Sequence, residues 1–298
     1  MSFPEWMRHS VWLRTFKLDA KVRLKAPLRV GVGRAVSLTA PTDLPVLKIS
    51  FQLRDGRSLE VPAIAGSSWK GVFRSTAYRL AKAHKLKVCE GLGEQNCIKP
   101  LERQLRNLLG QGSTSEALAL VWENVCILCK IFGAPGLASK VIFEDSYPAG
   151  LRNGEPQFDL GYRTGIAIDR RTGAVFRRAL YTVEFIQPGC EFSFSMTATN
   201  LPNYCLGLLM ACLLEVEAGR TRIGGFKSRG FGKVGFEELR IDVLRPAGSG
   251  ARGLESLDGQ DEALEEFGEP PWEGEDAWRI VRKLAEVWRR YARRVSSG

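Results

Sequence analysis

The amino-acid sequence predicts a mixed α+β fold, and three observations support this class. Apolar and charged residues alternate over residues 16–32, as they do along a strand with one solvated face. Apolar residues recur at helical spacing over residues 67–85 and 202–218. Further strand-like runs cover residues 140–145, 179–199 and 233–244. The order of strand, helix, strand, strand, helix, strand predicts a ferredoxin-like, RNA-recognition-motif-like βαββαβ core with insertions.

Local signals refine the helical regions. The helix at residues 67–85 follows a Gly-Ser-Ser sequence, so we expect Ser67 or Ser68 to be its N-cap. The insertion at residues 85–135 is expected to be mainly helical from residue 101, with a break near Gly112.

The composition changes after residue 246, where we expect the main domain, residues 1–246, to end. Residues 247–276 are predicted to form a flexible acidic linker, and residues 277–298 a basic amphipathic helix. We expect this helix to pack back on the domain, where the acidic stretch neutralises it. Binding of its basic face to RNA or to an acidic protein surface is the alternative.

The composition also limits the partners. The most apolar stretch, residues 204–214, is well short of the ~20 residues that a membrane-spanning helix needs. The N-terminus does not have the unbroken apolar core of a secretory signal, so we expect a cytoplasmic protein with no membrane partner. The net charge is +10 and is concentrated before residue 253, which favours nucleic acid as a partner. A solvated basic surface without a partner is the alternative.

Four of the seven cysteines are clustered in the sequence, at Cys89, Cys97, Cys126 and Cys129. A Cys-x-x-Cys pair supplies two corners of a tetrahedral zinc site, and the earlier pair could complete it. His84 could replace one thiolate. Reduced buried cysteines and a redox pair are the alternatives.

The glycine-rich segment, residues 224–236, contains the most informative motif. Its second half nearly matches the RNP1 pattern of RNA-recognition motifs, although Lys233 stands where a base-stacking aromatic residue is expected. Gly224 and Gly225 would let the backbone approach a phosphate, and Lys227 and Arg229 would add positive charge. A glycine-kinked turn before an edge strand is the alternative.

Several ordered motifs resemble the RAMP superfamily, the repeat-associated proteins of CRISPR effector complexes. The sequence Ala-Gly-Ser-Ser-Trp-Lys-Gly-Val-Phe-Arg at residues 65–74 resembles the helix start of that family, with alanine where proline is usual. The glycine-rich segment resembles the family's C-terminal signature, and residues 126–133 and 141–146 resemble its Leu-Phe-Gly and strand-aspartate segments. The sequence is most similar to the repeated backbone subunit of type III effector complexes.

This resemblance implies a subunit that binds CRISPR guide RNA and target RNA, beside other effector subunits and further copies of itself. Asp43, in the sequence Thr-Asp-Leu-Pro-Val, matches the position of the aspartate that the backbone subunit uses for metal-dependent cleavage of target RNA by a ribose 2′-OH. Mg²⁺ or another divalent ion would assist that cleavage. A turn-stabilising aspartate is the alternative interpretation of Asp43.

The same resemblance implies that residues 161–180 form a β-hairpin thumb that distorts RNA. The sequence Asp-Arg-Arg-Thr-Gly at residues 169–173 is a turn signature. The side chains that could wedge between bases are Ile166, Ile168, Val175 and Phe176. The remaining residues expected to contact RNA are Arg163, Arg170 and Arg171 on the hairpin, and Ser67, Ser68, Lys70 and Arg74 at the helix start.

Two other functions stay open. A non-catalytic member of the family would serve as a guide-RNA scaffold or end cap. A free-standing RNA-processing nuclease would need a general base near the scissile phosphate. The sequence has only two histidines, His9 and His84, and neither is beside the glycine-rich segment.

Overall fold

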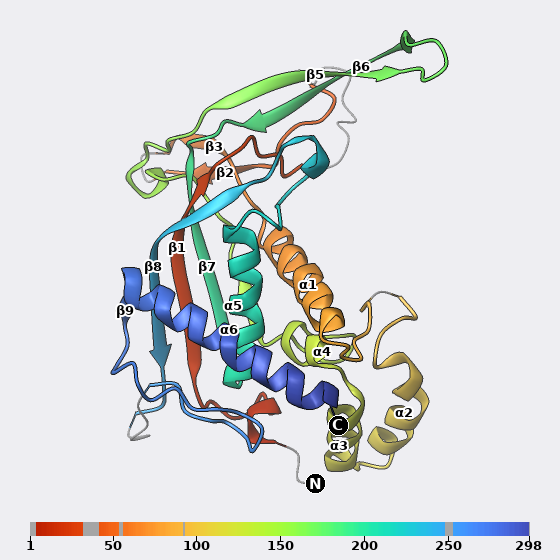
Figure 1. Ribbon diagram of the computed structural model, residues 1–298, viewed down its shortest axis with the longest axis vertical. Coiled ribbons are helices and arrows are strands. Elements are labelled where there is room, and N and C mark those ends of the chain that lie inside the picture. The colour runs from red at the N-terminus through yellow and green to blue at the C-terminus, as the bar shows by residue number, and fades with distance from the viewer. Residues whose placement is uncertain (1–3, 32–41, 54–55, 92, 248–252, 298) are drawn as a thin grey trace.

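The computed structural model describes residues 4–31, 42–53, 56–91, 93–247 and 253–297, and its antiparallel sheets and helices confirm the predicted α+β class (Figure 1). Every neighbouring pair of strands in the main sheet is antiparallel. The strands of this sheet, in spatial order, are β4 (Val141–Phe143), β7 (Glu191–Thr199), β1 (Thr15–Leu24), β8 (Val234–Leu244) and β9 (Trp272–Glu273).

Two helices, α1 (Gly66–Ala83) and α5 (Asn203–Glu217), lie on one face of this sheet (Figure 1). Burial alternates along β1, so that its apolar side chains face the helices and its charged side chains face solvent. Trp69 of α1 packs edge-on against Phe194 of β7, with ring centroids 4.9 Å apart. Along the chain the core elements follow the predicted order β1, α1, β4, β7, α5, β8.

A third layer, α6 (Gly274–Ser297), crosses the outer side of α5 (Figure 1). The two helices approach closely at Gly207, where an added Cβ would lie 2.1 Å from the carbonyl oxygen of Leu284. Arg290 of α6 pairs with Glu262 at 2.7 Å. The helix therefore packs on the domain with an acidic neighbour against its basic face, as the sequence predicts.

Residues 253–273 connect β8 to α6 and lie against the core, where Leu254 is buried. The side-chain amide of Asn203 donates hydrogen bonds of 2.7 Å to the carbonyl oxygens of Leu254 and Glu262. The start of the predicted acidic linker, residues 248–252, lies outside the described residues. The division into domains stays a prediction.

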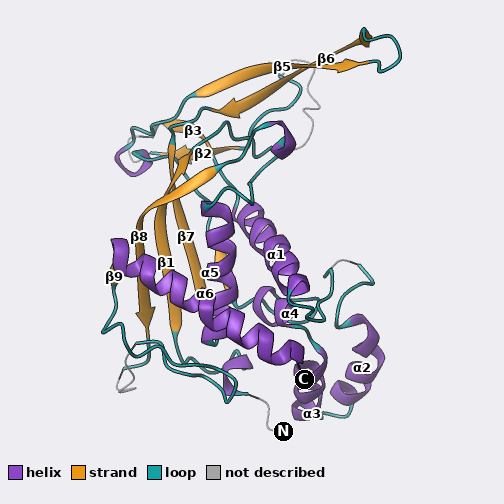
Figure 2. Cartoon of the chain, viewed as in Figure 1, coloured by secondary structure: helices purple, strands orange, loops and turns teal. Residues whose placement is uncertain are grey.

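Two hairpins form separate sheets at one end of the molecule (Figure 2). The strands of the first are β2 (Lys48–Gln52) and β3 (Ser58–Pro62), and those of the second are β5 (Leu160–Ile168) and β6 (Val175–Ile186). The second corresponds to the hairpin predicted over residues 161–180 and projects from the body of the molecule. The sequence did not predict the first, because its short, largely half-exposed strands show no clear alternation.

The inserted region contains α2 (Glu102–Gly110), α3 (Thr114–Asn124) and α4 (Ile127–Phe132), as the helical pattern predicts. The break between α2 and α3 includes Gly112, whose φ of +75° favours glycine. None of the helices in the described part of the chain is long and apolar enough to cross a membrane.

Candidate nucleic-acid interface and metal centre

The start of α1 and the glycine-rich segment meet at a groove of about 440 Å³, although they are far apart in the sequence. A third segment, residues 29–31, completes its lining. In Figure 1 the short helical turn η4 (Lys227–Arg229) lies beside the start of α1. The side chains and backbone that line the groove include those of Arg29, Ser68, Gly71, Ser75, Gly225 and Lys227.

Close packing explains the first glycine of the segment. Gly224 has a φ of +79°, and an added Cβ would lie 2.3 Å from the carbonyl oxygen of Arg29. The amide of Gly225 donates a hydrogen bond of 2.8 Å to that same oxygen. Glycine thus lets the segment dock on the backbone at Arg29, and the amide of Gly225 is already engaged.

An aspartate that is distant in the sequence accepts a hydrogen bond from the first backbone amide of α1. The N-cap is Ala65, and the amide of Gly66 donates a hydrogen bond of 2.7 Å to Oδ1 of Asp145. The expectation that Ser67 or Ser68 is the N-cap is therefore wrong. The amide of Ser68 donates to the carbonyl oxygen of Ala65 at 2.8 Å. Ser68 nonetheless lines the groove.

Lys70 and Arg74 do not line the groove, although Arg74 lines a neighbouring pocket that shares Gly71 and Ser75 with it. Residues 68, 71, 75 and 79 follow one helical stripe, and the positions of Lys70 and Arg74 are rotated away from it. Burial, and then the charge of Arg74, lower the pKa of Lys70, which shows that these two cations are close. The structure thus brings Ser68 to the glycine-rich segment, and it does not bring Lys70 or Arg74 into the groove lining.

Arg79 is a basic residue that the sequence motifs did not identify. It donates a hydrogen bond of 2.6 Å to the hydroxyl of Thr221. Desolvation, and then the charge of Arg79, lower the pKa of the groove residue Lys227, so Arg79 is near enough to add to the positive charge there. The repeat of Ser68, Ser75 and Arg79 at helical spacing is the sequence signal that could have found it.

Cationic and aromatic side chains join the glycine-rich segment to the root of the β5–β6 hairpin. Arg229 donates a hydrogen bond to the hydroxyl of Tyr181 on β6, and its guanidinium carbon lies 5.3 Å from the ring centroid of Phe226. The guanidinium carbon of Arg163 on β5 lies 5.2 Å from the ring centroid of Phe231. Arg163 and Arg229 therefore extend the same basic surface toward the hairpin.

The tip of the hairpin projects away from the body of the molecule (Figure 2), and its turn is exposed and contains basic residues. Arg170 and Arg171 lie in its turn, which Asp169 shapes by accepting the amide of Arg171 at 2.8 Å. The side chain of Phe176 lies outside the described residues. Three apolar residues of the hairpin are each about half exposed to solvent: Ile166, Ile168 and Val175.

Asp43 is exposed at the root of the same hairpin. Its Oδ2 accepts the amide of Thr182 on β6 at 2.7 Å, and the hydroxyl of Thr42 donates to the carbonyl oxygen of Thr182 at 2.7 Å. The buried carboxylate of Glu184 accepts the amide of Val46 at 3.0 Å. These and further backbone contacts with β6 fix the segment that carries Asp43.

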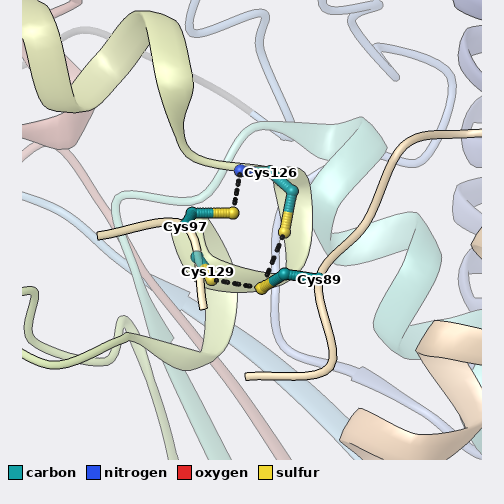
Figure 3. A group of neighbouring side chains, drawn as sticks. All are labelled: Cys89, Cys97, Cys126 and Cys129. Carbon is teal, nitrogen blue, oxygen red and sulfur yellow. Dashed lines mark hydrogen bonds between the residues drawn. The ribbon is translucent and has the colours of Figure 1, made fainter. Parts of the chain in front are cut away.

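Four cysteines from two segments form a cluster (Figure 3). The sulfur atoms of Cys89, Cys97, Cys126 and Cys129 all lie within 4.8 Å of one another. Cys89 is 3.3 Å from Cys129 and 3.7 Å from Cys126. A hydrogen bond from Cys129 is the largest cause that lowers the pKa of Cys126 to about 4. The prediction that these four cysteines lie together is confirmed.

This donor set fits a metal such as zinc. Zinc–sulfur bonds of about 2.3 Å in a tetrahedron separate the sulfur atoms by about 3.8 Å, close to the spacing in the cluster. Soft sulfur ligands also favour zinc over magnesium or calcium. His84 is not part of the cluster, since its ring packs against Trp288 with centroids 6.2 Å apart.

Comparison with known proteins gives two matches. The model of the RAMP superfamily matches residues 21–235. The CRISPR system Cms endoribonuclease Csm3 of Streptococcus thermophilus is 24% identical over 242 residues, which are 76% of this chain and 90% of that protein. The family match includes α1, the cysteine cluster and the start of β8. It ends before the acidic segment, residues 253–273, and before α6.

Proposed function

Because this chain belongs to the RAMP superfamily, we propose that it is an RNA-binding subunit of a type III CRISPR interference complex. The observation that carries the proposal is the groove, where the helix start at Ser68 meets Gly224, Gly225 and Lys227 of the glycine-rich segment, with the charge of Arg79 near enough to act on Lys227. The similarity to Csm3 supports the type III assignment. Its partners would be guide RNA, target RNA, other effector subunits and further copies of this chain.

We assign the core to the ferredoxin-like architecture. Its elements follow the βαββαβ order, its strands are antiparallel, and both helices pack on one face of the sheet. In this arrangement the groove lies at one end of the core, beside the start of α1.

Guide RNA would lie along the groove with its phosphates toward Lys227 and Arg79. Such contacts position a nucleic-acid backbone without reading its sequence, as a subunit that holds any guide requires. The Ser68 side chain offers a neutral hydrogen-bond donor beside them. Arg163 and Arg229 would continue the contact toward the hairpin, where target RNA would approach.

Asp43 is the proposed catalytic residue for cleavage of target RNA. Attack of a 2′-OH on the neighbouring phosphorus needs the strand distorted from A-form geometry, because a regular helix keeps the nucleophile and leaving oxygen out of line. The exposed apolar side chains of the hairpin are suited to impose that distortion. Mg²⁺ or a similar ion fits an exposed carboxylate, and Asp43 would hold it with water and RNA phosphate while the ion stabilises charge.

A non-catalytic guide-RNA scaffold or end cap is the second candidate. One observation favours it: the carboxylate of Asp43 already accepts the amide of Thr182. A structural role of this kind would account for an aspartate at this position without any chemistry.

Substitution of Asp43 separates the two candidates. Asp43→Asn keeps an oxygen that can accept the Thr182 amide but removes the charge, whereas Asp43→Ala removes both. If Asp43 is catalytic, both variants in the assembled complex should lose cleavage of matched target RNA by at least ~100-fold, while target binding stays within about threefold, a change of less than 1 kcal/mol. Gel analysis of labelled target RNA measures the rate. Cleavage at the wild-type rate in both variants would favour the scaffold.

A free-standing RNA-processing nuclease has less support. His84 follows the last turn of α1, at the opposite end of the helix from Ser68. His84 is nine residues, or about 14 Å along the helix axis, beyond Ser75, the last residue of α1 that lines the groove, so it is too far from that lining to act as a general base there.

We also propose that the cysteine cluster holds a structural Zn²⁺. The four sulfur atoms would tie the segment after α1 to the start of α4, and a closed set of four ligands is typical of structural sites. Elemental analysis of the purified protein should give one zinc per chain. A metal-free protein with an unchanged fold would contradict the assignment.

A further inference from the structure

Arg74 lies against the cysteine cluster. Its Nη2 is 4.0 Å from Sγ of Cys129, and its Nη1 donates a hydrogen bond of 3.0 Å to the carbonyl oxygen of Gly133. The guanidinium carbon lies 5.9 Å from the ring centroid of Phe132. These contacts, with the middle and the C-terminal end of α4, hold a permanent positive charge beside the sulfur atoms.

The segment that carries the first cysteine is shaped around this guanidinium. Gly91, two residues after Cys89, has a φ of +78°, and an added Cβ would lie 2.0 Å from Nη2 of Arg74. The amide of Gly91 donates to the carbonyl oxygen of Gln95 at 3.0 Å, which closes the turn between the first two cysteines. Glycine is therefore needed at this position both for the turn and for the space that Arg74 occupies.

The net charge of a zinc centre with four thiolates explains why a cation beside the cysteine cluster would be favourable. Four thiolates around one Zn²⁺ leave an excess of two negative charges, and the cluster is at least half-buried, so water solvates that charge incompletely. A guanidinium beside one sulfur offsets part of the excess. Partners of this kind also orient metal ligands and commonly strengthen metal binding.

We propose that Arg74 is a positioning residue of the metal centre, donating to the Cys129 thiolate and strengthening zinc binding. The proposal rests on the zinc site proposed above and is independent of RNA binding. It assigns Arg74 to the metal centre, although the sequence motif placed it with the RNA contacts.

Zinc affinity tests this proposal in the full-length protein. Arg74→Ala should weaken Zn²⁺ binding by about 10- to 100-fold, the usual effect of losing an outer partner of a metal ligand. Arg74→Lys keeps the charge but cannot bond to Gly133 and Cys129 together, so its loss should be smaller. Lys82→Ala is the matched control, because it removes a cation of α1 that lies over Tyr78. Competition with a chromophoric chelator measures the affinities.

Two further measurements distinguish positioning from unfolding. Co²⁺ bound to Arg74→Ala should keep the absorption of a tetrahedral thiolate site, which a collapsed site would lose. Gly91→Ala should also weaken zinc binding, because it displaces the guanidinium, and should weaken it much less in the Arg74→Ala background.

The outcomes separate this inference from the proposals on which it rests. Wild-type zinc affinity in Arg74→Ala overturns the role of Arg74 and leaves the zinc site standing. A wild-type protein that takes up no zinc overturns both. At saturating zinc, Arg74→Ala should bind single-stranded RNA within about twofold of wild type, or about 0.4 kcal/mol. A large loss of RNA binding with unchanged zinc affinity would show that Arg74 contacts RNA and does not support the metal centre.

Discussion

The groove and α6 are both rich in cations, but their cations have opposite surroundings. On α6, basic side chains pair with acidic residues or carbonyl oxygens of residues 260–276. At the groove, the charge of Arg79 contributes to the lowered pKa of Lys227. A cation already paired with a carboxylate offers little to a phosphate, whereas neighbouring cations gain from one.

This difference shows that composition alone does not locate a nucleic-acid surface. The last 21 residues hold seven basic residues and one acidic residue, but α6 is neutralised from within the chain. The groove draws its charge from segments that are distant in sequence, and only the fold brings them together. We therefore expect RNA to bind at the groove and not on α6.

Neutralising the groove cations should have the largest effect. Lys227→Gln combined with Arg79→Gln should weaken binding of single-stranded RNA by about 100-fold at 0.1 M salt, and should lower the slope of log affinity against log salt by about 1 to 2, because two phosphate contacts are lost. Fluorescence anisotropy across a salt series measures both quantities. An unchanged slope would show that these two cations do not contact phosphates.

Raising the pH should have a smaller effect. Desolvation and the charge of Arg79 lower the pKa of Lys227, so this lysine loses its proton at a lower pH than an ordinary lysine. RNA affinity should then fall by about threefold between pH 7 and pH 9.5, a range below the ordinary lysine pKa. Lys227→Arg should remove most of this pH dependence. A wild-type affinity that stays constant over this range would contradict a contact between Lys227 and phosphate.

Substitutions on α6 should have the smallest effect. Lys283→Ala combined with Arg290→Ala removes two pairs with the acidic segment. RNA affinity should change by less than about twofold, and the free energy of unfolding should fall by no more than about 1 kcal/mol, since exposed ion pairs contribute little. Anisotropy and urea denaturation measure the two quantities. A loss of RNA binding equal to that of the groove variant would contradict the claim that RNA binds at the groove and not on α6.

The sequence predicted the elements whose burial follows a local period. Alternation in β1 and helical spacing in α1 and α5 are visible in a short window, as is the break at Gly112. The four cysteines could be grouped because thiolate spacing is informative by itself. The resemblance of residues 65–74 and 224–236 to the family placed two sides of the groove before any fold was known.

The features that the sequence did not reveal depend on distant contacts. The N-cap of α1 was misassigned because Asp145, far along the chain, accepts the first amide in place of a local serine. The surroundings of Arg74 depend on Cys129 and Gly133, which helical spacing cannot place. Arg29 joins the groove only because the glycine-rich segment docks on its backbone.

Photo-crosslinking of RNA in the native assembly tests the central claim most directly. Complexes isolated with their RNA would be irradiated and digested, and the crosslinked peptides identified by mass spectrometry. The groove predicts crosslinks in the peptides that contain Ser68 to Ser75 and Gly224 to Phe231. Crosslinks confined to α6, or their absence from both groove peptides in an assembly that contains RNA, would contradict it.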